Sequence, residues 1–483
     1  MTKFRVKIDK KKNALVFIYL KYIMTNNYIS SNGYVIPFKN LKDIKKDLTV
    51  KPIVDPSYVT ESYPVYRMNA NEIWIPKFYG LQKFGPVSDL RERSGIVINN
   101  CEVISLRSDQ KEFVDKILEY IYANDSCIGC AKTGAGKTVM ALYIISVIKK
   151  KTLIIVHKEF LLEQWIDRIK QFLPDIKIGT IRSQTIDIEN KDIVIGMLQS
   201  ISMKEYDNSI FDDFGFVIVD ECHHICSRTF SNALFKIAAK KMLGLSATPQ
   251  RKDGLTKVLE WFLGPIITKR DTYNDISKPT VFYYKAVYSS VIIPKYNSRT
   301  GHLISSDLIT KISIDATRNR QIVDIVIELL DLNRKILILS DRRNQCQEMY
   351  DMISKIISDT EFTVGLYLGS MSKEQINETN ECDIILATYS MASEGYDNPR
   401  LDTLVFATGR TDIVQSCGRI LRQKNENYPL IIDMVDLLQI SQFRKRKSYY
   451  KKCAFKLVNC SEDDEFDVLQ NRQISDITMF RSL

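Results

Sequence analysis

The chain has 483 residues, of which 45% are hydrophobic and 26% are charged. This length exceeds what one hydrophobic core serves, and the composition is typical of a globular protein with about three domains. Lys and Arg total 68 against 58 Asp and Glu, and the resulting net charge of +10 favours a polyanionic partner without specifying one. No apolar run approaches the roughly 18–20 residues that span a bilayer, so we expect no membrane-spanning segment.

Residues 1–100 are rich in Tyr, Ile, Lys and Asn and are punctuated by Pro and Gly. The alternating stretch Glu72–Pro76 indicates a strand, and we expect a small α+β accessory domain here, with a role in substrate recognition. A Lys-rich start followed by the apolar Ala14–Met24 resembles a signal peptide. Lys21 and the lack of a small-residue cleavage site argue against one, so we expect a soluble intracellular protein.

Between residues 101 and 268, short β-branched runs alternate with segments of helical period. The runs are Leu153–Val156, Ile193–Ile195 and Phe216–Val219, and the segment Phe160–Ile169 has its apolar residues at helical spacing. Such alternation predicts a parallel sheet covered by helices.

The same alternation returns between residues 315 and 440. The expected strands contain Ile336–Leu339, Val364–Tyr367, Ile384–Leu386, Leu404–Phe406 and Leu430–Ile432. The sequence therefore predicts a second parallel-sheet lobe, joined to the first by a linker or small insertion at 269–314. A tail at 441–483 begins with a basic run, Arg444–Lys447, and then becomes acidic at Glu462–Asp467.

The ten cysteines are scattered except for Cys127 and Cys130. This spacing occurs in redox and zinc sites, but the chain offers no second pair at ligand spacing and has only four histidines. Because the pair lies in an apolar stretch, we expect both thiols to be buried by packing, with no structural metal. Free thiols suit a reducing compartment.

A phosphate-binding loop is predicted at residues 131–138. Its residues are Ala131, Lys132, Thr133, Gly134, Ala135, Gly136, Lys137 and Thr138. The loop follows a strand-like run and precedes a helical pattern, so backbone N–H groups and the helix N-terminus would face the β-phosphate of a nucleotide. Lys137 would contact the β- and γ-phosphates, and the Thr138 hydroxyl would ligate Mg²⁺. Ala131 stands where the general pattern has Gly.

An acidic pair, Asp220 and Glu221, follows the predicted strand Phe216–Val219. Carboxylates at the carboxyl end of a parallel strand are placed to meet a metal beside the phosphate loop. Asp220 would hold Mg²⁺ through a water molecule, Glu221 would position the attacking water, and His223 would sense the γ-phosphate. The alternative, in which Asp220 only caps a helix, does not explain its place after a phosphate loop.

These motifs resemble those of superfamily-two helicases. Asp220-Glu-Cys-His223 is similar to the family's Asp-Glu-x-His box, and Ser246-Ala-Thr248 is similar to the motif that couples hydrolysis to strand movement. Residues 245–254 resemble the Rad25/XPB-like branch, found in large eukaryotic DNA viruses and phages, although Lys252 replaces a Glu of that branch. Upstream, the resemblance implies that Gln110, with Arg107 beside it, recognises the adenine.

The second lobe carries the remaining helicase motifs. Gln415-Ser-Cys-Gly-Arg-Ile-Leu-Arg422 is similar to the family's Gln-x-x-Gly-Arg-x-x-Arg. The resemblance implies that Arg419 and Arg422 lie on one helical face and act as arginine fingers, with Gln415 in the same catalytic motif. It further implies that Gly395 and Asp397 contact the nucleotide. Nucleic-acid contacts are implied for Ser246, Thr248, Arg251, Gly369 and Thr388.

The resemblance implies two tandem RecA-like lobes that close on ATP and Mg²⁺ and step along a nucleic-acid strand. DNA is favoured because of the Rad25-like run, and a role in viral transcription or in DNA repair and recombination follows from the branch. Three alternatives stay open: an RNA helicase, a duplex translocase that does not separate strands, and a binding scaffold with an inactive ATPase. The basic run at 444–447 has three interpretations: a phosphate-binding patch, a nuclear address or a solvated helix face.

Overall fold

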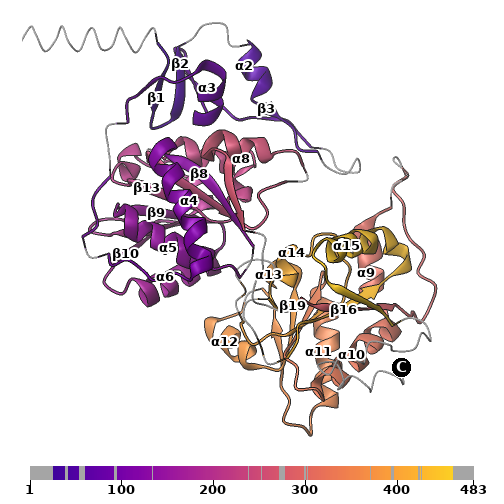
Figure 1. Cartoon of the computed structure of the whole chain (residues 1–483). Helices are drawn as coiled ribbons and strands as arrows, with labels where there is room; N and C mark the ends of the chain where they lie inside the picture. The colour runs from indigo at the N-terminus through magenta and orange to yellow at the C-terminus, as the bar shows by residue number, and fades with distance from the viewer. Residues whose placement is uncertain are drawn as a thin grey trace, which may run out of the picture. The chain divides into compact units, whose positions relative to one another are not determined.

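The structure is a computed structural model, and it describes residues 26–37, 42–53, 60–91, 95–99, 101–132, 134–237, 239–251, 253–270, 278–298, 301, 303–369, 371–392, 396, 398–421, 425 and 427–460. The chain divides into two compact units. The first consists of Met1–Ala131 and Gly136–Asp271, and the second consists of Lys132–Ala135 and Thr272–Leu483. Figure 1 shows helices on both faces of the large sheet in each unit.

The first unit begins with a small α+β domain. Its sheet has the order β5-β6-β2-β1-β7. The elements are β1 (Tyr28–Ser30), β2 (Gly33–Pro37), α2 (Lys42–Asp47), β3 (Thr49–Val50), β4 (Tyr63–Pro64), β5 (Arg67–Met68), β6 (Glu72–Ile75), α3 (Lys77–Phe84) and β7 (Ser88–Asp89). Strand β6 alternates between buried and half-buried residues, as its sequence predicts. Tyr79 of α3 packs edge-on against Trp261 of the helix α8 (Thr256–Leu263), with ring centroids 5.3 Å apart, and so joins this domain to the rest of the first unit.

The main sheet of the first unit has eight strands in the order β11-β10-β12-β9-β13-β14-β8-β15. The strands are β8 (Ser126–Ala131), β9 (Thr152–Val156), β10 (Ile178–Arg182), β11 (Thr185–Asp187), β12 (Ile193–Met197), β13 (Phe216–Val219), β14 (Lys241–Ser246) and β15 (Ile266–Arg270). All neighbours are parallel except β10 and β11. The helices are α4 (Ser108–Asn124), α5 (Lys137–Ile148), α6 (Glu159–Phe172), α7 (Leu198–Met203) and α8 (Thr256–Leu263), with 3₁₀ turns η1 (Asn208–Phe211), η2 (Cys222–Ile225) and η3 (Phe230–Phe235).

The second unit has a seven-stranded parallel sheet in the order β18-β19-β17-β20-β21-β16-β22. The strands are β16 (Thr280–Lys285), β17 (Ile336–Ser340), β18 (Val364–Tyr367), β19 (Ile384–Thr388), β20 (Thr403–Phe406), β21 (Leu430–Val435) and β22 (Lys456–Asn459). The helices are α9 (Ser305–Ser313), α10 (Ala316–Leu330), α11 (Arg343–Ile356), α12 (Lys373–Glu381), α13 (Tyr389–Ala392), α14 (Val414–Cys417) and α15 (Ile440–Lys452), with the turn η4 (Leu437–Gln439). Apolar residues of α10 and α11 cover one face, and those of α13, α14 and α15 cover the other.

The fold class predicted from the sequence is confirmed: two tandem parallel-sheet lobes follow a small α+β domain. The expected strands are present, and the central ones are buried along their whole length because helices cover both faces. Cys127 and Cys130 both lie on β8 and are buried, and burial raises the pKa of the Cys127 thiol to about 12.

Two segments differ from the sequence-based expectation. The stretch expected to be a linker, 269–314, contributes β16, which lies between β21 and β22 in the second sheet. The tail expected after 440 contributes α15 and the edge strand β22. Thr280–Lys285 is a β-branched and aromatic run that favours a strand, but it lies outside the regular alternation of the two lobes. It joins the second sheet by pairing with β21 and β22, which are distant in the sequence.

The basic run at the start of the tail lies on α15 and has two environments. Arg444 and Lys445 are exposed, as on a solvated helix face, whereas Arg446 is buried. The Arg446 guanidinium donates to both carboxylate oxygens of Asp433 on β21 at 2.9 Å, and the Tyr450 hydroxyl donates to Asp433 Oδ2 at 2.8 Å. Because the Arg446–Asp433 ion pair is buried and both oxygens of Asp433 accept hydrogen bonds, it holds α15 against β21. Among the described residues, no helix has the length and apolarity to cross a bilayer.

We expect Arg446→Ala to destabilise the protein by about 3–5 kcal/mol, because it leaves the buried Asp433 carboxylate without its partner. The matched control is Arg444→Ala, an exposed position on the same helix, which should change stability by less than about 0.5 kcal/mol. Urea unfolding followed by circular dichroism measures both. Equal effects of the two substitutions would contradict the structural role of the buried pair.

Candidate ATPase and nucleic-acid motor site

The phosphate loop joins the carboxyl end of β8 to the N-terminus of α5. Gly134 and Gly136 have φ angles of +82° and +84°, which favour glycine, and the Ala135 N–H donates to the Lys132 carbonyl at 3.2 Å. Lys137 begins α5, and its Nζ lies 3.2 Å from the Ala131 carbonyl oxygen. Thr133 lies outside the described residues. The turn therefore presents a cation and a helix N-terminus together, which is what a polyphosphate requires.

Gln110, expected to recognise the adenine, lies against this loop. It is buried at the start of α4, and its Oε1 accepts from the Arg107 backbone N–H at 3.2 Å. A Cβ added at Gly136 would lie 2.4 Å from Gln110 Nε2, so the side-chain amide fills the space that a larger residue would need. Arg107 is within ion-pair distance of Asp109, 3.4 Å, and is well exposed. The structure thus brings Gln110 and Arg107 next to the phosphate loop.

Asp220 is half-buried directly after β13, and both of its oxygens are bonded. Oδ2 accepts from Trp165 Nε1–H at 2.9 Å, and Oδ1 accepts from the Glu221 backbone N–H at 3.0 Å. Burial first, and the neighbouring Glu221 carboxylate second, raise the pKa of Asp220, while the Trp165 hydrogen bond acts to lower it. A cation at this place would offset both unfavourable contributions, so the carboxylate suits a metal ligand.

Glu221 has φ +43° and ψ +52°, the left-handed conformation that non-glycine residues seldom adopt. Such strain persists where the surrounding structure enforces it, and it is common at functional positions. The conformation carries the carboxylate to Lys137, with Nζ and Oε1 3.5 Å apart, and to His223, with Nδ1 and Oε2 3.4 Å apart. The acidic box and the phosphate loop are therefore joined by direct contacts.

The Ser246 hydroxyl connects the acidic box to the next motif. It lies 2.9 Å from His223 Nδ1 and 3.4 Å from Glu221 Oε2, and it accepts from the Thr248 backbone N–H at 3.1 Å. Ser246 has no exposed surface. The end of β14 is enclosed, so the expected contact of Ser246 with nucleic acid stays a prediction that this burial does not support. Its position suits the coupling role implied by the motif.

Arg251 and Thr248 were expected to contact nucleic acid. The Arg251 guanidinium donates to Asp253, with its Nε 3.0 Å from Oδ1, and to the His223 carbonyl oxygen. Burial acts to raise the pKa of Asp253, but the hydrogen bonds from Arg251 and Leu255 lower it overall. Arg251 therefore holds the loop after β14 against the acidic box, and Thr248 remains half-buried beside it. Lys252 lies outside the described residues.

Sequence reasoning missed two features of this site. The rings of His157 and His224 stack with centroids 3.8 Å apart, and the His224 ring lies 4.3 Å from that of His223. Trp165 was assigned only to the apolar side of a helix, although its indole bonds to Asp220. The position of His157 was a usable signal. It directly follows β9, and because the carboxyl ends of parallel strands meet at one edge, the sequence could have placed it near the acidic box.

In the second unit, the expected nucleic-acid residues lie at the carboxyl ends of neighbouring strands. Thr388 ends β19 and is buried, with its Oγ1 3.1 Å from Ser390 Oγ. Gly369 follows β18, and its carbonyl accepts from Arg343 Nη2 at 3.4 Å. Gly395 and Asp397, which were expected to contact the nucleotide, lie outside the described residues.

The arginine motif differs locally from its prediction. Helix α14 ends at Cys417, and the Arg419 N–H donates to the Ser416 carbonyl, a tightened i to i−3 turn, so Arg419 does not continue a helical face. Its side chain is buried, and Nη1 donates to the Tyr396 carbonyl. Arg419 thus ties this motif to the preceding one within the second unit. Gln415 is half-buried on α14, and Arg422 lies outside the described residues.

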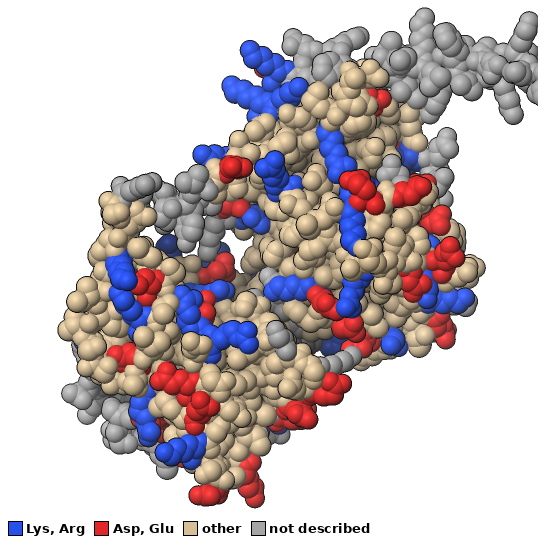
Figure 2. Space-filling model, turned by 180° about the vertical axis from the view of Figure 1, so that it is seen from behind, with Lys and Arg blue, Asp and Glu red and all other residues tan. Residues whose placement is uncertain are grey.

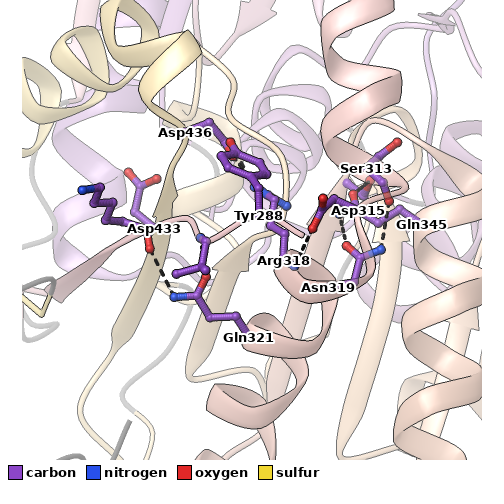
Figure 3. Close-up of polar contacts among 12 residues, drawn as sticks. Tyr288, Ser313, Asp315, Arg318, Asn319, Gln321, Gln345, Asp433 and Asp436 are labelled. Atoms are coloured by element: carbon purple, nitrogen blue, oxygen red, sulfur yellow. Dashed lines mark hydrogen bonds and ion pairs between the residues drawn. The ribbon is translucent and has the colours of Figure 1, made fainter. Parts of the chain in front are cut away.

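A buried polar network positions the strand ends of the second unit (Figure 3). Arg318 on α10 donates through Nε and Nη2 to the two oxygens of Asp436, at 2.7 and 3.0 Å, and Tyr288 donates to the same carboxylate. The next residue of α10, Asn319, accepts from Gln345, whose own oxygen accepts from the Ser340 hydroxyl at 2.6 Å. The turn after β17 is therefore held by side chains of α10 and α11.

The residues present fit a nucleotide with its magnesium. The cradle of glycines and Lys137 matches a polyphosphate, while the half-buried Thr138 and Asp220 supply the hard oxygen donors that Mg²⁺ prefers. Glu221 is held between a lysine and a histidine, where it can orient a water molecule. The fold and this constellation define a phosphate-loop ATPase with a second lobe of similar construction.

Comparison with known proteins agrees with that class. Residues 103–251 match the family model described as Type III restriction enzyme, res subunit. The chain is 36% identical, over 89% of its length and 86% of the relative's, to a protein named Putative ATP-dependent RNA helicase in Acanthamoeba polyphaga mimivirus. It is 26% identical to proteins of that same name in African swine fever virus, over 73% of both chains, and to a Probable helicase of Escherichia phage T5, over 84% and 89%.

The chain belongs to the superfamily-two helicases and is an ATP-hydrolysing nucleic-acid helicase. The named relatives are viral.

We predict that Glu221→Gln keeps ATP binding and lowers turnover by about 10²- to 10⁴-fold, because the amide no longer accepts a proton from the attacking water. The measurement pairs equilibrium binding of a fluorescent ATP analogue with steady-state phosphate release. Glu119→Gln, an exposed carboxyl on α4, is the matched control and should behave as the natural protein. Unchanged turnover in Glu221→Gln would remove this residue from the water-positioning role.

Proposed function

We propose that this helicase is a DNA motor of the Rad25/XPB-like branch, using Lys137, Asp220, Glu221 and His223 for ATP hydrolysis and the Ser246–Thr248 segment for coupling. The observation that carries the proposal is the set of contacts among Lys137, Glu221 and Ser246. One carboxylate touches both the phosphate-loop cation and the hydroxyl of the coupling motif. Loss of the γ-phosphate beside Lys137 would therefore be transmitted to β14 through the side chains of Glu221 and Ser246.

In this proposal the first unit binds ATP through the phosphate loop, with Gln110 and Arg107 against the base. Thr138 and Asp220 would hold Mg²⁺, which when bound neutralises phosphate charge. Glu221 orients the attacking water and takes its proton, and His223 responds to the γ-phosphate. Gln415, Arg419 and Arg422, with Gly395 and Asp397, would complete the nucleotide site from the second unit. The stabilisation of transferred phosphoryl charge by arginine supports this division.

Nucleic-acid binding is proposed to act mainly through phosphates. On the face drawn in Figure 2, Lys and Arg are interspersed with Asp and Glu over the described residues and do not form one basic stripe. Thr388 and Gly369 lie at the ends of the neighbouring β-strands β19 and β18. A hydroxyl and a backbone group there can contact the phosphates of a nucleic-acid strand. Contacts of this kind bind without sequence preference and weaken with salt.

DNA is favoured over RNA because of the loop after β14. Residues 245–254 resemble the Rad25-like run, with Lys252 in place of its Glu, and Arg251 and Asp253 of that run are bonded to each other beside the acidic box. RNA is the second candidate, because the viral relatives are named as RNA helicases. A duplex translocase that does not separate strands would use the same residues.

The biological setting follows from the relatives, which are viral. We propose work in viral transcription, or in DNA repair and recombination, with the transcription or repair machinery as partner. The places of action would be the host nucleus or cytoplasm, or the virion. The small α+β domain, which packs on α8 through Tyr79 and Trp261, is the proposed substrate-recognition element.

The test is the steady-state ATPase rate with no nucleic acid, with single-stranded, duplex and forked DNA, and with RNA. We expect strong stimulation by DNA and weak stimulation by RNA of equal length. The Glu221→Gln protein, purified in parallel, controls for contaminating ATPases. Stimulation mainly by RNA would move the protein to the RNA-helicase alternative, and equal rates in all five conditions would contradict a nucleic-acid motor.

A further inference from the structure

The direction of the Asp220 carboxylate is set by two hydrogen bonds of different origin. The Glu221 backbone N–H binds Oδ1 at 3.0 Å and is available in any chain with this turn. The bond to Oδ2 comes from the side chain of Trp165, whose Nε1–H lies 2.9 Å away. Replacing that tryptophan by any residue without a donor at the same place would free Oδ2 to rotate.

Trp165 is itself held firmly. It lies in the middle of α6 with 2% of its surface exposed, on the same side as the buried Leu161, Leu162 and Ile169. This apolar side packs α6 onto the sheet next to β9 and β12. Because β9 is the parallel neighbour of β13, the indole reaches the carboxyl end of β13 from the side. The helix therefore aims a rigid donor at a carboxylate that is distant in sequence.

The chemistry of the donor suits a metal ligand. An indole N–H is neutral and can only donate, so it fixes the carboxylate without cancelling its charge. A lysine or arginine at this place would compete with a bound cation. Removing a side chain that hydrogen-bonds to a metal ligand and orients it typically lowers metal affinity by about 10- to 100-fold.

We propose that Trp165 is a positioning residue that holds Asp220 in the orientation needed to bind the magnesium of MgATP. The inference rests on the proposed function, which assigns Asp220 to the metal. Trp165 touches neither nucleotide nor nucleic acid in this role, and it acts through Asp220 alone.

The test measures binding of a non-hydrolysable fluorescent ATP analogue to the full-length protein as a function of Mg²⁺ concentration, and again in EDTA. We expect Trp165→Phe to raise the Mg²⁺ concentration at half-saturation by about tenfold, the effect of losing one hydrogen bond to a charged group. Binding in EDTA should not change, because the phosphate loop remains intact. Trp261→Phe, a half-buried tryptophan on α8 in the same unit, is the matched control.

The Asp220→Asn background separates the possible failures. If Asp220→Asn itself leaves the Mg²⁺ dependence unchanged, the assignment of the metal site fails. If Asp220→Asn shifts the dependence and Trp165→Phe does not, the present inference is overturned. An equal Trp165→Phe effect in both backgrounds, or an equal loss in EDTA, overturns it as well, because the residue would then act through the fold.

A second readout does not depend on nucleotide. The chain has three tryptophans, Trp74, Trp165 and Trp261, so a ¹⁵N-tryptophan spectrum contains three indole N–H signals. We expect Asp220→Asn to move the Trp165 signal, and the other two to stay in place. An unmoved Trp165 signal would overturn the hydrogen bond on which the inference depends.

Discussion

The parallel order of three strands, β13, β14 and β8, is the constraint on which the catalytic geometry depends. Neighbouring parallel strands end at one edge of the sheet, and their register pairs Val219 with Gly244 and Ser246 with Cys130. The residues that follow are the acidic box after β13, the coupling motif after β14 and the phosphate loop after β8. This strand order places Glu221 within 3.5 Å of both Lys137 and the Ser246 hydroxyl. The strand order therefore brings the three motifs together.

The edge also explains why the site contains buried charges and strain. Asp220 is half-buried and has a raised pKa, and Glu221 is held at a positive φ. Both features oppose folding, and both are supported by neighbouring groups: Trp165 from α6 and Lys137 from α5. The apolar faces of the surrounding helices stabilise this edge of the sheet. The order of the site therefore depends on how well α5 and α6 pack.

Much of this could be predicted from the sequence. Alternating β-branched runs and helical periods gave the two parallel sheets, and the glycine-rich turn and Asp220–Glu221 gave the candidate site. Local patterns could not reveal that β16 and β22 belong to the second sheet, because each lies outside the regular alternation of that lobe and pairs with strands distant in the sequence. They could not reveal Trp165 as a donor either, since a tryptophan on an apolar helix side is usually part of the core. The enclosure of Ser246 and Arg419 likewise depends on tertiary packing that no motif encodes.

The second unit also contains a parallel sheet, but different contacts stabilise the positions of its strands. Two buried ion pairs hold β21 and the residue after it, Arg446 with Asp433 inside the strand and Arg318 with Asp436 directly after it, whereas the contacts of the first unit centre on Glu221. Such pairs contribute to a defined geometry more than to net stability. The proposed function requires this lobe to present Thr388, Gly369 and the arginine motif, and a defined geometry would favour that role.

The central claim is that the Ser246 hydroxyl links the hydrolysis site to movement, and the most direct measurement is the number of ATP molecules hydrolysed per unit of translocation in Ser246→Ala. Triplex displacement reports movement on the nucleic acid that best stimulates the ATPase, and phosphate release reports hydrolysis. The account predicts that hydrolysis is largely retained while displacement falls steeply, so the ratio rises. A Ser246→Ala protein in which both rates fall together, or in which neither changes, would contradict it.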